Sequence, residues 1–108
     1  MGTYIVDVYL LWKDEPWAGK AVKLHYKPRR FLDFGSSYSK VEVTDNEGHA
    51  TFEIDDCEDT ADGKIDEDTP IIITVQNHGN FDFGPYTLGG SGYTINMDPD
   101  TEQEQISF

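Results

Sequence analysis

Carboxylate side chains crowd one stretch of the sequence, between residues 53 and 68. They are Glu53, Asp55, Asp56, Glu58, Asp59, Asp62, Asp66, Glu67 and Asp68, and Lys64 is the single opposing charge among them. Hard oxygen ligands at this density suit calcium, and carboxylates so close in sequence repel one another unless a cation or solvent separates them. The sequence therefore leaves two interpretations, a solvated acidic loop or a calcium site. The predicted calcium ligands are Asp55, Asp56, Glu58, Asp62 and Asp66.

The calcium hypothesis does not extend to an EF-hand. With Gly63 at the sixth position of such a loop, Glu58 falls at the first ligand position and Thr69 at the twelfth. The EF-hand pattern requires aspartate first and a bidentate glutamate last. Helical periodicity is also missing on both sides of the segment. A calcium site here would be a looser site in a loop between strands, and no other cofactor is expected.

A second group of residues, between 17 and 34, is basic and aromatic. Lys20, Lys23, Lys27, Arg29 and Arg30 lie there, with Trp17 before them and Phe31 and Phe34 after them. Arginine beside exposed aromatic rings is typical of protein interfaces. The predicted partner-binding residues are therefore Trp17, Lys27, Arg29, Arg30, Phe31 and Phe34. The alternative is that Phe31 and Phe34 close one end of the hydrophobic core.

Motifs for catalysis are not evident. Cys57 lies among carboxylates, which disfavour a reactive thiolate. His25, His49 and His78 fall on separate predicted elements, so a zinc site would need the fold to bring them together with a carboxylate. Neither a nucleophile elbow nor a glycine-rich phosphate loop leading into a helix is present. We therefore expect a protein without enzymatic activity.

Length and charge narrow the class of protein. A chain of 108 residues is expected to form one domain, and a single cysteine allows no intrachain disulfide. The net charge of −13, from 21 acidic and 8 basic residues, argues against nucleic acid and an anionic membrane as partners. No apolar run reaches the length of a membrane helix. The compartment stays open: extracellular or cell-surface for a piece of a larger protein, cytoplasmic for a full-length chain.

Side-chain alternation predicts seven strands and no helix. The strands are expected at residues 4–12, 21–26, 71–76, 83–88 and 93–97, with two more inside residues 41–54. A period of two indicates strands that bury one face, and several short strands separated by turns favour an antiparallel β-sandwich. The predicted sandwich domain covers residues 1–97. Residues 98–108 are expected to be an acidic, mobile tail.

The clearest strand signal is residues 41–54, which we interpret as a hairpin. Val41 and Val43 share one face of the first strand, and alternate residues from Ala50 to Ile54 share one face of the second. Asp45, Asn46 and Gly48 between them supply turn chemistry, because Asx side chains bond nearby backbone and glycine accepts a positive φ. The alternation places both valines in the core.

Three short motifs resemble prealbumin-like modules, which include the transthyretin-like and carboxypeptidase regulatory-like domains and the collagen-adhesin B-type repeats. The motifs are residues 18–24 (AGKAVKL), 44–52 (TDNEGHATF) and 84–88 (GPYTL). The resemblance implies a seven-stranded, prealbumin-like or Ig-like sandwich. Such modules are mostly non-catalytic: they act as spacers, stabilise a neighbouring domain or present loops to partners.

Two active branches of this family can be tested against the sequence. Transthyretin-like hydrolases end in Tyr-Arg-Gly-Ser, whereas this chain ends in Gln-Ile-Ser-Phe, so that activity is not expected. Self-crosslinking adhesin modules join a lysine to an asparagine beside a buried carboxylate. Here the candidates are Lys13 or Lys23, Glu42 or Glu53, and Asn96. Lys23, Glu42, Glu53 and Asn96 are predicted to face solvent, which disfavours the crosslink because that reaction needs buried groups.

These observations predict a non-catalytic structural or protein-interaction module whose partner is another protein or a neighbouring domain. The alternative is a calcium- or carbohydrate-binding module of an extracellular protein. For a sugar, Trp17 and Tyr38 are the aromatic rings that the predicted core leaves available for stacking.

Overall fold

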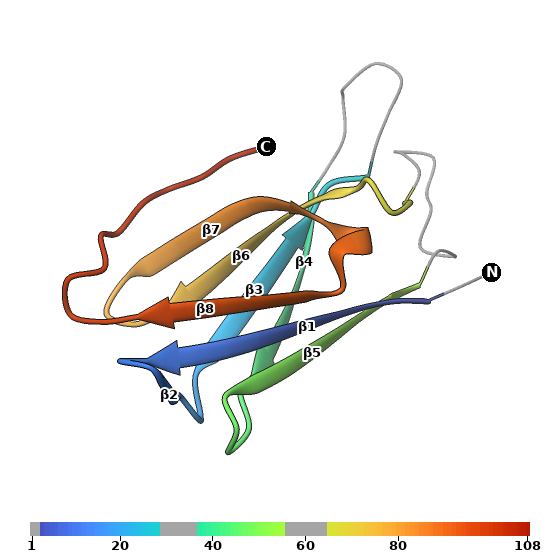
Figure 1. Ribbon diagram of the computed structural model, residues 1–108. Coiled ribbons are helices and arrows are strands. Elements are labelled where there is room, and N and C mark those ends of the chain that lie inside the picture. The colour runs from blue at the N-terminus through green and yellow to red at the C-terminus, as the bar shows by residue number, and fades with distance from the viewer. Residues whose placement is uncertain (1–2, 29–36, 56–64) are drawn as a thin grey trace.

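Two β-sheets lie face to face, and their inner faces form one hydrophobic core (Figure 1). The computed structural model describes residues 3–28, 37–55 and 65–108. This part of the chain is all-β, which confirms the predicted class at the level of a β-sandwich. The strands are β1 (Thr3–Trp12), β2 (Glu15–Pro16), β3 (Ala21–Tyr26), β4 (Tyr38–Val43), β5 (His49–Asp55), β6 (Pro70–Gln76), β7 (Asn80–Thr87) and β8 (Gly92–Met97), and a short 3-10 helix, η2 (Leu88–Gly90), precedes β8.

In the first sheet, β1 pairs antiparallel with β2 and β5 and parallel with β8. The second sheet has the order β4-β3-β6-β7 and is antiparallel throughout. The described residues thus form eight strands, one more than the seven predicted. The additional strand is the two-residue β2, which pairs with the end of β1 and lies between the strands predicted at residues 4–12 and 21–26.

Alternating apolar side chains fill the space between the sheets. The predicted burial of one face is confirmed for β1, β3 and β5, because alternate side chains are buried while their neighbours along each strand are more exposed. The fully buried residues include Val6, Val8, Leu10, Val22, Leu24, Phe52, Ile54, Ile71, Ile73 and Val75. Each large apolar side chain buried in this way contributes roughly 1.5–3 kcal/mol relative to an exposed position.

The prediction that residues 41–54 form a hairpin is wrong. β4 pairs with β3 in one sheet and β5 pairs with β1 in the other, so the turn between them connects the two sheets. Thr44 fixes this crossing: its hydroxyl donates to Trp17 O (2.7 Å) and accepts from Lys20 N (2.9 Å). Gly48 packs against β1, where a Cβ atom would lie 2.3 Å from Leu10 O.

The register of β4 also corrects the predicted core. Val41 lies opposite Lys23, on the outer face of the sheet. Val41 and Val43 are therefore 53% and 60% exposed instead of buried. Lys40 alternates to the inner side, where its Nζ donates to Glu53 O of the other sheet (2.8 Å). A period of two identifies two faces, but the pairing partner decides which face meets the core.

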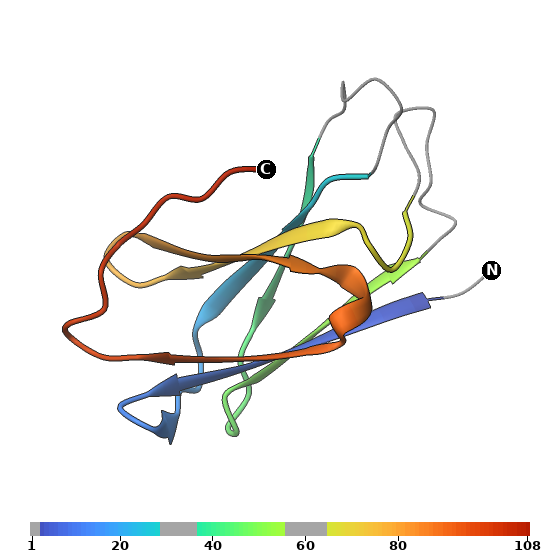
Figure 2. The ribbon, with the colours of Figure 1, turned by 45° about the horizontal axis from the view of Figure 1, so that its top comes forward.

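The C-terminal segment returns along β7, as the two views in Figures 1 and 2 show. It first turns at Asp98, whose carboxylate accepts from Asp100 N (2.8 Å). Farther on, Asp82 N donates to Glu104 O (3.3 Å) and Ile106 N donates to Asp82 Oδ2 (3.0 Å). The segment predicted to be a mobile tail thus has defined contacts with the second sheet.

Candidate functional site

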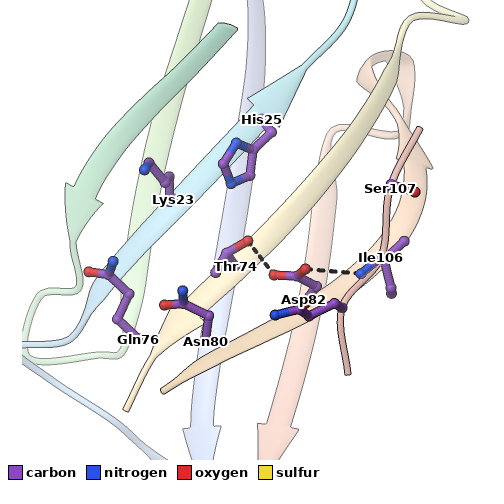
Figure 3. A pocket seen from close by; sticks show the side chains of 9 residues that line it. Lys23, His25, Thr74, Gln76, Asn80, Asp82, Ile106 and Ser107 are labelled. Atoms are coloured by element: carbon purple, nitrogen blue, oxygen red, sulfur yellow. Dashed lines mark hydrogen bonds between the residues drawn. The ribbon is translucent and has the colours of Figure 1, made fainter. Parts of the chain in front are cut away.

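A polar groove of about 440 Å³ crosses the outer face of the second sheet (Figure 3). Three strands form its floor, and the C-terminal segment forms one side. Its lining residues are Lys23 and His25 from β3, Thr74 and Gln76 from β6, Asn80 and Asp82 from β7, and Gln105, Ile106 and Ser107. We take this groove as the candidate functional site.

Strand register places the groove residues side by side. Lys23 pairs with Thr74, and Thr74 pairs with Asp82, so three polar side chains form a row across three strands. Gln76 and Asn80 form the next pair, at the turn between β6 and β7. Directly opposed residues point to the same face of a sheet. The same alternation that buries one face therefore gathers these polar groups on the other.

Asp82 ties the floor of the groove to its wall. Its Oδ1 accepts from Thr74 Oγ1 (2.7 Å), and its Oδ2 accepts from Ile106 N (3.0 Å). Thr74 is only 5% exposed although it lies on the outer face, because this side of the sheet is covered at β7. Both carboxylate oxygens are engaged, so Asp82 acts as a fixed acceptor that holds the C-terminal segment.

His25 and Lys23 give the groove its other titratable groups. Partial burial lowers the pKa of His25; the neighbouring Lys23 charge lowers it further, and Asp82 opposes the shift. The imidazole is therefore neutral near pH 7, with one donor and one acceptor nitrogen. With the amides of Gln76 and Asn80, the groove offers mixed donors and acceptors and one cation, which suits polar, hydrogen-bonding ligands.

A second polar cluster lies on the outer face of the first sheet. His49 Nε2 contacts Asp7 Oδ1 (2.7 Å), Thr51 Oγ1 donates to the same oxygen (3.0 Å), and Tyr9 stacks on the imidazole at 4.7 Å between ring centroids. The pKa of Asp7 is lowered, chiefly by its hydrogen bond with His49. This convergence was not predicted, because it depends on the pairing of β1 with β5, which side-chain alternation does not specify.

This cluster has the residue types of a hydroxyl–imidazole–carboxylate triad but the wrong geometry. In a working triad the acid and the hydroxyl bond opposite nitrogens of the imidazole. Here Thr51 Oγ1 lies 3.1 Å from His49 Nε2, the same nitrogen that faces Asp7. The Thr51 proton is directed to Asp7, so the hydroxyl is not activated as a nucleophile.

Most of the predicted calcium ligands, Asp56, Glu58 and Asp62, lie outside the described residues. Asp55 accepts from Thr3 Oγ1 (2.8 Å), and Asp66 Oδ1 accepts from Asp68 N (2.9 Å) in the turn before β6. Within the residues that the structure describes, no group of three or more His, Cys, Asp or Glu side chains is placed to hold a metal ion. The calcium site stays a prediction.

The predicted partner-binding residues are only partly placed. Arg29, Arg30, Phe31 and Phe34 lie outside the described residues. Trp17 packs on Trp12 at 4.6 Å between ring centroids, and Lys20 Nζ lies 4.7 Å above the Trp17 ring. Lys27 N donates to Pro70 O at the end of the sheet. Trp17 is half-buried against the core, so one of its faces already has a partner.

Tyr38, considered for sugar stacking, and Asn96, considered for a crosslink, both have partners in the structure. Tyr38 stacks on Tyr26 at 5.7 Å between ring centroids and packs against the core. Asn96 hydrogen-bonds to Asp14 on the first sheet, whereas Lys23 lies on the outer face of the second. The structure therefore does not bring Lys23 and Asn96 together. Lys13, the other lysine considered, follows β1, and its N donates to Met97 O at the end of β8 (2.8 Å).

Comparison with known proteins adds no family assignment. No protein-family model matches the chain, and no curated protein matches it. The resemblance to prealbumin-like modules consequently rests on the three short motifs alone. The described residues also contain no helix of sufficient length and apolar character to cross a membrane.

Proposed function

We propose that this domain is a non-catalytic protein-interaction module that binds an extended polypeptide segment in the polar groove. The observation that carries the proposal is the seating of the chain's own C-terminal segment beside β7. The hydrogen bonds of Asp82 to this segment go to main-chain groups, Glu104 O and Ile106 N. Such contacts do not depend on side-chain identity, and they resemble those by which peptides bind along strands.

The rest of the groove has capacity for a further ligand. No described residue hydrogen-bonds to the side chains of Lys23, Gln76 or Asn80 at the groove floor. Amide side chains both donate and accept, as a peptide backbone requires, and Lys23 adds a site for a carboxylate. A segment lying between β3 and the C-terminal segment would satisfy these groups.

Two further considerations support a binding module over an enzyme. The carboxylates of Asp82 and Asp7 face neighbouring polar side chains in the two polar clusters, and both already accept hydrogen bonds from the protein itself. The motif resemblance to prealbumin-like modules also favours a non-catalytic role, either as a spacer or as a partner-binding domain. Carbohydrate binding is the weaker alternative, since no Trp, Tyr or Phe among the described residues lines the groove.

Selection of peptides from a displayed library against the full-length domain tests the proposal. Peptides that bind the groove should lose affinity for Lys23→Ala and Asn80→Ala and keep it for Thr94→Ala, a control on the opposite sheet. Selected peptides that bind all three variants equally would place the interaction elsewhere.

The alternatives have separate readouts. Calcium at a hundred times its dissociation constant would stabilise the fold by about 2.7 kcal/mol, and a chelator would reverse the effect. A glycan panel that quenches tryptophan fluorescence would favour carbohydrate binding. Either result without peptide binding would replace the present proposal.

A further inference from the structure

The second sheet has two edges that differ in how they are covered. At β7, the C-terminal segment lies alongside and accepts a hydrogen bond from Asp82 N. At the opposite edge, β4 pairs with β3 on one side only. An exposed edge strand is a template for pairing with another strand.

Hydrogen bonds at the end of β4 show which residues face β3. In antiparallel strands, opposed residues alternate between pairs that exchange both backbone bonds and pairs that exchange none. Thr44 N donates to Lys20 O (2.9 Å) and Thr44 O accepts from Gly19 N (2.9 Å), so both backbone groups of Thr44 face the segment that leads into β3. Counting by twos along the continuous register, Glu42 and Lys40 also direct their backbone groups toward β3.

The intervening residues Ser39, Val41 and Val43 therefore direct their N–H and C=O groups to the open edge. Among the residues that the structure describes, none bonds to these groups from that side. The side chains of Val41 and Val43 are the most exposed large apolar groups of the described chain, at 53% and 60%. Unpaired backbone and exposed β-branched side chains coincide on one short strand.

We propose that two copies of this protein pair through β4, antiparallel, with the twofold axis at Val41. In this register Val41 faces the Val41 of the second copy, and the two residues exchange both backbone hydrogen bonds. Ser39 faces Val43 and forms a bonded pair in the same way, on each side of the axis. The two sheets then become one continuous sheet across the dimer.

Charge selects this register over its neighbours. Pairing about Val41 places Lys40 opposite Glu42 of the second copy, twice by symmetry. A shift of the axis to Lys40 or to Glu42 would instead place like charges opposite each other, which is destabilising. Lys40 does not block the edge, because it lies on the inner side of β4, where its Nζ also donates to Glu53 O. Glu42 alternates to the same side, so the charged pairs form there.

Net charge and contact length set the strength of the dimer. Each copy carries −13, so the copies repel at low ionic strength, and added salt screens this repulsion within a Debye length of about 8 Å at physiological strength. The paired segment is short, residues 39–43, so the dimer should be weak and depend on protein concentration. Its formation does not require that the groove bind a peptide.

Sedimentation velocity of the full chain over a concentration series tests the inference. The wild type should shift from the mass of one chain toward that of two, more so at physiological than at low salt. Glu42→Lys should weaken the dimer by about tenfold, since both cross-strand charge pairs are lost. Lys40→Glu added to Glu42→Lys should restore it. Glu102→Lys, with the same change in net charge, should not weaken it.

Cysteine crosslinking reads the register directly in a Cys57→Ser background. Val41→Cys should form a disulfide dimer, because position 41 faces itself, and Glu42→Cys should not, because it faces Lys40. Absence of a dimer at every concentration, a dimer indifferent to Glu42→Lys, or equal crosslinking at 41 and 42 would each overturn the proposal. The proposal would also be overturned if β4 paired with a strand of another protein while the chain itself stayed monomeric.

Discussion

Removal of the Asp82 carboxylate is the sharpest test of how the groove is built. Asp82 joins a buried hydroxyl on β6 to a main-chain N–H of the C-terminal segment, through Thr74 Oγ1 and Ile106 N. Asp82→Ala removes both acceptors at once. The C-terminal segment then retains only the bond from Asp82 N to Glu104 O beside β7.

The magnitude follows from the burial of the partner groups. Thr74 is 5% exposed, so its hydroxyl would be left buried without an acceptor, and such a group costs about 1–3 kcal/mol. We expect Asp82→Ala to lower the free energy of unfolding by about 2 kcal/mol, a fall of roughly 10 °C in Tm. Replacing both partners by apolar groups is much less costly. Thr74→Val should therefore recover about 1 kcal/mol in the Asp82→Ala background, although it destabilises the wild type.

Denaturant unfolding of the four proteins of this double-mutant cycle measures the coupling between the two side chains. Hydrogen exchange at the Ile106 amide gives a second, local readout, because its protection should fall in Asp82→Ala and remain in Thr74→Val. Asp100→Asn is the control for charge, since it removes one negative charge near the start of the C-terminal segment. A coupling energy near zero, or unchanged protection at Ile106, would refute the assigned network.

Three further predictions concern the fold that carries the groove. Thr44→Val should cost about 2 kcal/mol in denaturant unfolding because it removes both side-chain hydrogen bonds of Thr44 at the sheet crossing, and the exposed control Thr94→Val should cost under about 0.5 kcal/mol. Gly48→Ala should cost about 3 kcal/mol or more in the same assay, since its φ is 73° and its Cβ would meet backbone, whereas Gly92→Ala meets no atom within 4 Å and serves as the control. The lowered pKa of Asp7 means that its contribution is fully present above the ordinary value of 3.8 and is lost as the pH falls through the lower folded value. Asp7→Asn should thus lower the free energy of unfolding at neutral pH and reduce its dependence on pH in the acid range. An equal loss of free energy above and below pH 3.8 would contradict this.

Local pattern predicted much of the architecture. Most strand positions and the inward faces of β1, β3 and β5 follow from a period of two, because side chains on a strand alternate whatever the partner. The turn before β5 also follows locally, since Asp45 and Gly48 have the required chemistry. The same pattern could not reveal that this turn crosses between sheets, so Val41 and Val43 were assigned to the core.

The groove was not predicted. Its floor brings together Lys23, Thr74 and Asp82, which are far apart in sequence and individually resemble ordinary solvent-facing strand residues. Its wall comes from a segment whose acidity predicts a mobile tail. The expectation of antiparallel strands indicated that polar side chains would share the outer face of a sheet. Only the register shows which of these side chains lie opposite one another.

By itself the sequence determined the class of fold, the faces of the central strands and the absence of an obvious catalytic motif, because these depend on composition and local periodicity. Tertiary structure decided which strands pair, and through pairing it decided what each outer face presents. It placed Asp82, together with Thr74 and Lys23 in the same row, beside the C-terminal segment. It also directed the backbone N–H and C=O groups of Val41 to the open edge of β4. Hydrogen bonds between strands join residues distant in the chain, and no local pattern specifies which partner each strand will meet.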